Sequence, residues 1–168
     1  MPRNGFALSA IALLMTAGCA GSRHDRGAGE PSGLVGAWRS TVQFQDGAFA
    51  QIKDLEFLYA FNAGGTMTES SNYDSAPPVP PAYGVWRSLG SARFECVYIF
   101  YMTKPPEDAT QIAGGWAPAG RGELVERIEL AADGRAFNST LTLTLFDEAG
   151  APVEGGGRAT GHAVRIGF

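Results

Sequence analysis

The feature that most constrains this chain is an alternation of apolar and polar residues that recurs along most of its length. It is clearest over residues 137–146, where Phe, Ser and Leu occupy every second position and Asn and Thr lie between them. Successive side chains of a β-strand point to opposite faces of its sheet, so this period predicts strands with one buried face. Turn signals such as Asp46-Gly47 and Asp133-Gly134 separate the alternating runs.

The alternating runs predict a single all-β domain over residues 34–168. The predicted strands cover residues 36–45, 55–61, 66–70, 83–87, 92–102, 110–117, 123–130, 137–146 and 152–167, of which 110–117 is the weakest. Most connections are short, and no run has the period of a helix. We therefore expect an up-and-down antiparallel barrel of eight to nine strands, because closure removes the exposed edges of a meander.

The first 33 residues have a different character. Arg3 precedes an uncharged apolar run over residues 6–17, which has the length of a signal-peptide core and is too short to span a bilayer. Thr16-Ala17-Gly18-Cys19 resembles a bacterial lipobox, in which the Cys is lipidated and becomes the new N-terminus. We predict a signal peptide over 1–18 and a flexible linker over 19–33; the alternative is an ordinary signal peptide cut near Ala20.

A lipid on Cys19 would attach the protein to a membrane. Ala20, which is not Asp, follows this cysteine, and by the known sorting rule it favours the outer membrane, with the protein facing the periplasm or the cell surface. The alternative is secretion. Loss of residues 1–18 removes Arg3 and no acid, so the formal charge changes from −4 to −5, which argues against a nucleic-acid partner.

Only two cysteines are present, and lipidation of Cys19 or its removal leaves Cys96 alone. Cys96 lies in the apolar strand 92–102, where a single cysteine is typical of a small buried side chain. No basic neighbour is available in the sequence to lower the pKa of its thiol.

The first strand of the domain begins with Gly36-Ala37-Trp38, which resembles the Gly-x-Trp motif of the lipocalins. The resemblance implies that Gly36 and Trp38 close one end of the barrel and that Arg165, in the last strand, packs across the indole. The pattern from Phe61 to Thr66, followed after a loop by residues 84–87, is also similar to uncharacterised exported barrels. The sequence has no disulfide of the kind typical of lipocalins, and only the ambiguous residues 104–115 could form the helix that precedes their last strand. It therefore resembles a minimal lipocalin-like (calycin) domain, and the ligand class does not carry over.

The inward positions of the predicted strands carry a set of aromatic rings. The predicted ligand-binding residues are Phe57, Tyr59, Phe61, Trp86, Phe94, Tyr98 and Phe100, together with Glu126. Rings with a few hydroxyl groups suit a small hydrophobic or amphipathic molecule. The alternative is that the same rings fill the barrel as its core, and the sequence does not separate the two.

Glu126 is predicted to face inward, where an isolated carboxylate is costly. It could pair with Arg165 or with an amine of a ligand. We favour a position at a wet rim, or a shifted strand register that turns Glu126 outward.

The sequence has no recognisable catalytic triad, metal-binding spacing or phosphate-binding loop, so we expect no metal and no cofactor. In some haem-holding barrels of the wider superfamily the final strand supplies a histidine that binds the iron, and His162 lies in the final strand here. His162 faces outward, however, if Arg165 faces inward. A binding protein is therefore the first hypothesis. The alternatives are an isomerase or cyclase that uses Glu126, Tyr98 or Cys96 as acid or base on a lipid-like substrate, and an interaction or inhibitor module of the cell envelope that uses the proline-rich loop 72–82. The oligomeric state is not predicted.

Overall fold

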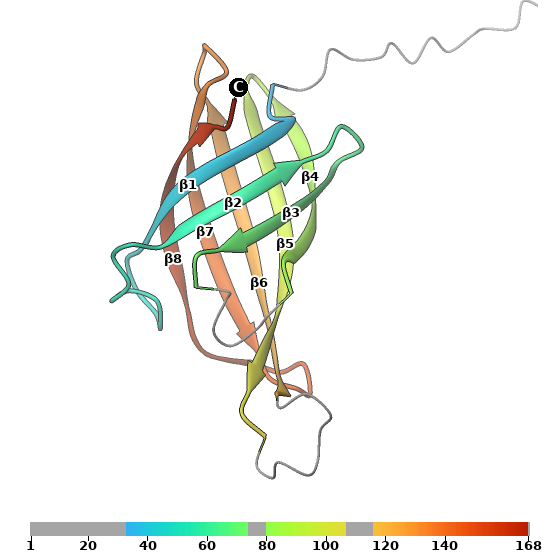
Figure 1. The fold of residues 1–168 in the computed structure, drawn as a ribbon, viewed down its shortest axis with the longest axis vertical. Coiled ribbons are helices and arrows are strands. Elements are labelled where there is room, and N and C mark those ends of the chain that lie inside the picture. The colour runs from blue at the N-terminus through green and yellow to red at the C-terminus, as the bar shows by residue number, and fades with distance from the viewer. Residues whose placement is uncertain (1–32, 74–79, 107–115, 168) are drawn as a thin grey trace, which may run out of the picture.

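The computed structural model describes residues 33–73, 80–106 and 116–167, and they form a closed antiparallel barrel of eight strands (Figure 1). The strands are β1 (Gly36–Phe44), β2 (Glu56–Phe61), β3 (Thr66–Ser71), β4 (Ala82–Gly90), β5 (Arg93–Lys104), β6 (Ala117–Leu130), β7 (Ala136–Phe146) and β8 (Pro152–Arg165). Each strand pairs with the next along the chain, and β1 pairs with β8 to close the ring. The predicted fold class is confirmed.

The boundaries differ from the prediction mainly in the third quarter of the chain. Most of the predicted weak strand 110–117 lies outside the described residues, as do the predicted signal peptide and nearly all of the linker. β6 begins at Ala117 and so includes a segment ahead of the predicted strand 123–130. Pro118, Gly120 and Gly122 interrupt the apolar pattern in that segment, which is why the sequence did not indicate a strand there.

Alternate side chains of each strand point into the barrel, as the period of two predicted. In β1 the buried residues are Trp38, Ser40, Val42 and Phe44, and the residues between them are more exposed. In β7 the buried positions run from Phe137 to Leu145 in steps of two. The buried side chains of the strands form a single core inside the ring, to which β4 contributes fully only through Ala82.

The two ends of the barrel are built differently. Figure 1 shows the end of β8 and the β6–β7 turn at one end, and the β7–β8 turn at the other. We call the first the plugged end, because Trp38, Phe61, Phe137 and Arg165 gather there. We call the second the cavity end. In the part of the chain that the structure describes, no helix is long and apolar enough to cross a membrane.

Candidate functional site

Trp38 and Arg165 meet at the plugged end, where they are paired across β1 and β8. The indole of Trp38 is fully buried, and its Nε1–H donates a hydrogen bond to the Leu34 carbonyl at 2.9 Å. The Arg165 guanidinium carbon lies 4.2 Å from the centre of the Trp38 ring, which is a cation–π contact. This is the geometry that the lipocalin resemblance implied.

The Arg165 side chain also fastens neighbouring backbone segments at this end. Its Nη1 donates to the Val35 carbonyl at 2.7 Å and its Nε donates to the Gly134 carbonyl at 2.9 Å, while Nη2 donates to the carbonyl of Gly33. A single guanidinium thus joins the entry to β1, the β6–β7 turn and the indole. Five N–H donors in a fixed fork make arginine suited to such a position.

Gly36 has a specific reason to be glycine. Its φ is +136°, a value that side chains disfavour, and a Cβ atom there would lie 2.6 Å from Nη1 of Arg165. The Gly-x-Trp opening therefore supplies both the indole and the space through which the guanidinium crosses it.

The middle of the barrel contains a polar cluster around Glu126, which we call the polar centre. Tyr98 donates its Oη hydrogen to Oε2 of Glu126 at 3.0 Å, and Tyr59 donates to Oε1 at 3.4 Å. The Ser139 hydroxyl lies close by without a hydrogen bond of ordinary geometry. The three hydrogen-bonded side chains come from β6, β5 and β2, so the polar centre spans the barrel.

The favoured interpretation of Glu126, a wet rim or a shifted register, is wrong. Glu126 has no exposed surface, and β6 keeps the predicted register with Leu124 and Ile128 buried on the same face. Arg165 is engaged with Trp38 and the backbone of the plugged end. Two tyrosine hydroxyl groups take the place of the expected cation or water, because they supply donors without adding a charge.

Burial raises the pKa of Glu126 from 4.5 to about 7, because the apolar interior disfavours the charged form. The hydroxyl groups of Ser139, Tyr98 and Tyr59 favour the charged form and partly oppose this effect. The barrel therefore holds a carboxyl group whose pKa lies near neutral pH although its side chain has no exposed surface.

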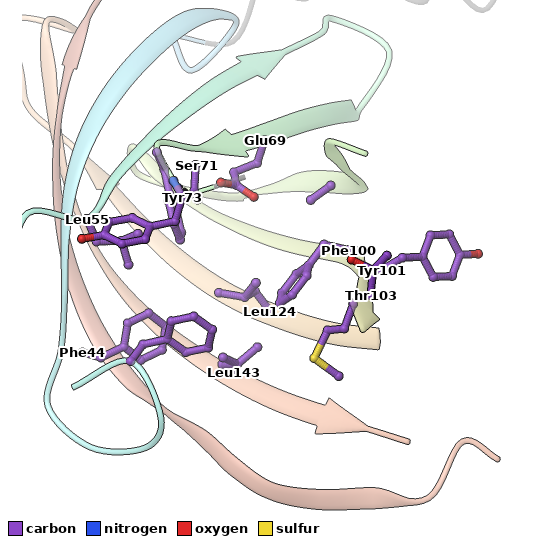
Figure 2. A pocket seen from close by; sticks show the side chains of 14 residues that line it. Phe44, Leu55, Glu69, Ser71, Tyr73, Phe100, Tyr101, Thr103, Leu124 and Leu143 are labelled. Carbon is purple, nitrogen blue, oxygen red and sulfur yellow. Dashed lines mark hydrogen bonds between the residues drawn. The ribbon is translucent and has the colours of Figure 1, made fainter. Parts of the chain in front are cut away.

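At the cavity end the inner side chains enclose a cavity of about 290 Å³. Phe44, Leu55, Phe57, Phe100, Leu124 and Leu143 form most of its apolar wall (Figure 2). Tyr73 and Tyr101 also border the cavity and are exposed, so it reaches the surface of the described part of the protein. Its volume is near the lower end of the range for ligand sites, which begins at about 300 Å³.

The predicted ligand-binding residues divide between the cavity and the core. Phe57 and Phe100 border the cavity. Tyr59, Tyr98 and Glu126 form the polar centre beneath it. Phe61, Trp86 and Phe94 pack against one another towards the plugged end. The two interpretations of the aromatic set therefore each describe one part of the barrel, and ligand binding by these residues stays a prediction.

Glu69 is the site residue that sequence reasoning missed. It lies on β3 with only 5% of its surface exposed, and it borders the cavity together with Ser71. Figure 2 shows its side chain projecting from β3 into the space bordered by Phe100 and Leu124. The signal was present, since Met67 and Glu69 share one face of the strand by the period of two. Met67 is, however, the only apolar residue of the run 66–71, and a single residue does not establish which face turns inward.

The other candidate chemical groups are placed as follows. Cys96 has no exposed surface, and burial raises the pKa of its thiol, so it is not poised as a nucleophile. His162 lies on the outer face, where its Nδ1 is 2.9 Å from Oδ1 of Asn138. No group of three or more potential metal ligands occurs among residues 33–73, 80–106 and 116–167.

The outer face of β4 and β5 carries exposed apolar side chains. Tyr83 pairs with Ile99 and Val85 pairs with Val97, and Tyr101 lies farther along β5. Most of the proline-rich segment before β4, residues 74–79, lies outside the described residues. This surface is relevant to the interaction-module hypothesis, but no described residue covers it or indicates a partner.

No protein-family model matches the sequence, and no curated protein is significantly similar to it. The eight-stranded closed barrel is compatible with a lipocalin-like or calycin-like fold. The functional argument therefore depends on the geometry of the site itself.

Proposed function

We propose that this protein is an exported, lipid-anchored, lipocalin-like barrel that binds a small hydrophobic or amphipathic molecule at the cavity end. The observation that carries the proposal is the contrast within one barrel: rings fill the plugged end, whereas apolar side chains at the other end surround a cavity of about 290 Å³. A barrel of eight strands has room either for its own side chains or for one small ligand. In this barrel side chains fill the plugged end, and we propose that the cavity end holds the ligand.

The enzyme alternative has less support. Glu126, Tyr98 and Cys96 are all fully buried, and none of them borders the cavity. An acid or base must come within hydrogen-bond distance of the substrate atom that it serves. Ligand binding, in contrast, requires only the side chains that line the cavity.

Binding can be tested with a neutral dye, N-phenylnaphthylamine, whose fluorescence rises in an apolar site. We expect saturable binding by the wild-type protein and its loss in Ala82→Phe, because Ala82 is buried and borders the cavity. Ala60→Phe is the matched control, since Ala60 is exposed on the outer face of β2. Equal dye binding by all three proteins, each shown to be folded by circular dichroism, would contradict the proposal.

Export and anchoring depend on residues outside the described structure. The apolar run over 6–17 and the Thr16-Ala17-Gly18-Cys19 motif support them. In a bacterial host we expect labelled palmitate to be incorporated into the wild-type chain and not into Cys19→Ser. Incorporation into both would exclude Cys19 as the anchor, and incorporation into neither would favour the secreted alternative.

A further inference from the structure

The charged groups inside the barrel are all acidic. The buried polar side chains of the described residues are Ser40, Glu69, Glu126 and Ser139, and no Lys, Arg or His of residues 33–73, 80–106 and 116–167 is buried. The described basic side chains are distributed over the outer surface and the plugged end. Among the Asp, Glu, Lys, Arg and His side chains of the described residues, the buried ones are therefore both carboxyl groups, Glu69 and Glu126.

Glu69 is the buried acid that borders the cavity. It is paired with Tyr59 on β2 and with Ala82 on β4, so it lies at the boundary between the polar centre and the cavity. Only 5% of the surface of Glu69 is exposed. Water therefore screens a charge on Glu69 far less than a charge on a surface carboxylate.

The two acids act on the same part of the interior. Burial raises the pKa of Tyr59 and of Tyr98 most strongly, and the charges of Glu126 and Glu69 raise both pKa values further. Glu69 and Glu126 are therefore close enough to influence the same pair of hydroxyl groups. A positive charge on a ligand near Glu69 would be attracted by both acids, whereas a negative charge would be repelled by them.

The rest of the wall suits the same kind of ligand. Phe44, Phe57, Phe100 and Tyr73 present aromatic rings to the cavity. Aromatic faces attract cations, most strongly where water is excluded, and they also pack well against an alkyl chain. One buried carboxylate among several rings is a suitable environment for an ammonium group attached to an apolar body.

We infer that the cavity selects amphipathic molecules that carry a basic nitrogen, and that Glu69 receives this nitrogen while the apolar body packs against the aromatic wall. The inference rests on the proposed binding function and adds the class of ligand. It makes Glu69 the residue that sets specificity, and it makes fatty acids, which carry the opposite charge, poor ligands.

The test compares decylamine, decanol and decanoate, which share one chain length and differ in charge. Each is titrated against the dye complex at neutral pH, and its power to displace the dye is measured. We expect decylamine to displace the dye at a concentration about tenfold lower than decanol, in keeping with the strength of a buried charge-assisted hydrogen bond, and decanoate to be the weakest.

Glu69→Gln keeps the shape of the side chain and removes its charge. We expect it to abolish the preference for decylamine over decanol, so that the two displace the dye from the variant at similar concentrations. Glu129→Gln is the matched control, because Glu129 is an exposed glutamate on β6. Equal displacement by decylamine and decanol with the wild-type protein would overturn the inference, whether or not the variant folds.

A preference that survives in folded Glu69→Gln would overturn the assignment to this residue. If neither the dye nor decanol binds the wild-type protein, the proposed binding function itself fails. If both bind without a preference for the amine, only the inference about the ligand class fails. The two failures are therefore distinguishable.

Discussion

The plugged end and the cavity end of this barrel are made from the same kinds of side chain, and yet one is full and the other is hollow. At the plugged end Trp38 lies 5.0 Å from Phe137, ring centre to ring centre, and Arg165 covers it from outside. At the cavity end the ring centres of Phe44 and Phe49 lie 5.4 Å apart, and Phe44 borders a cavity of about 290 Å³.

The difference shows that aromatic content alone does not determine whether a barrel is filled. The plugged end has an entry segment, Gly33 to Val35, whose carbonyl groups accept two hydrogen bonds from Arg165 and one from Trp38. The polar centre then separates the filled part from the hollow part. The ends should therefore respond differently to equivalent mutations.

The largest expected difference is between Trp38→Ala and Phe44→Ala. Trp38 is surrounded on all sides, so its truncation leaves a new void and should lower the free energy of unfolding by about 3–5 kcal/mol. Phe44 already borders a cavity and has fewer contacts to lose, so its truncation should cost about 2 kcal/mol or less. Urea unfolding monitored by circular dichroism measures both, and equal costs would show that the two ends are packed alike.

The next effect concerns the polar centre and is a dependence on pH. Between about pH 4.5 and pH 7 folded Glu126 keeps a proton that the unfolded chain has released, so the free energy of unfolding should fall as the pH rises across this interval. The full effect is on the order of 3 kcal/mol, and outside the interval Glu126 contributes no slope.

Glu126→Gln cannot titrate and should flatten this pH dependence, whereas the exposed control Glu129→Gln should leave it unchanged. Urea unfolding at several pH values provides the measurement. A slope that persists in Glu126→Gln would assign the titration to a different group.

The smallest effects compare the basic residues that fasten each end. Arg165→Ala removes a cation–π contact and three donors from partly buried carbonyl groups, so we expect a loss of about 1–3 kcal/mol. Lys104 bonds to Glu148 at 2.6 Å near the cavity end, but both side chains are about half exposed. Lys104→Ala should therefore cost less than about 1 kcal/mol. Thermal unfolding of both variants measures the two losses of stability. A larger loss in Lys104→Ala than in Arg165→Ala would show that the cavity end is the more strongly fastened of the two.

Much of the architecture could be predicted because it depends on local pattern. The period of two in residues 137–146 fixed which side chains of β7 face inward, and the same rule placed His162 outside and Ala163 inside. The contact between Trp38 and Arg165 was expected from the resemblance of the Gly36-Ala37-Trp38 opening to the lipocalin Gly-x-Trp motif, and the structure places the two side chains together.

The candidate site was less predictable. The sequence placed Glu126 on an inward face, but whether an inward carboxylate is tolerated depends on donors that come from β2 and β5, far away in the chain. Glu69 was missed because β3 has a single apolar residue, Met67, and one residue does not mark the inner side of a short strand until its neighbours are known.

By itself, the sequence therefore determined the all-β class, most of the strand pattern and the inward face of the clearly alternating strands. These are consequences of local geometry, in which each strand needs only its own period. The tertiary structure alone decided which inward rings fill the barrel and which border a cavity, and it alone brought two acids to one interior. Both outcomes depend on side chains that meet across the ring, and such distances are set only when the eighth strand closes on the first.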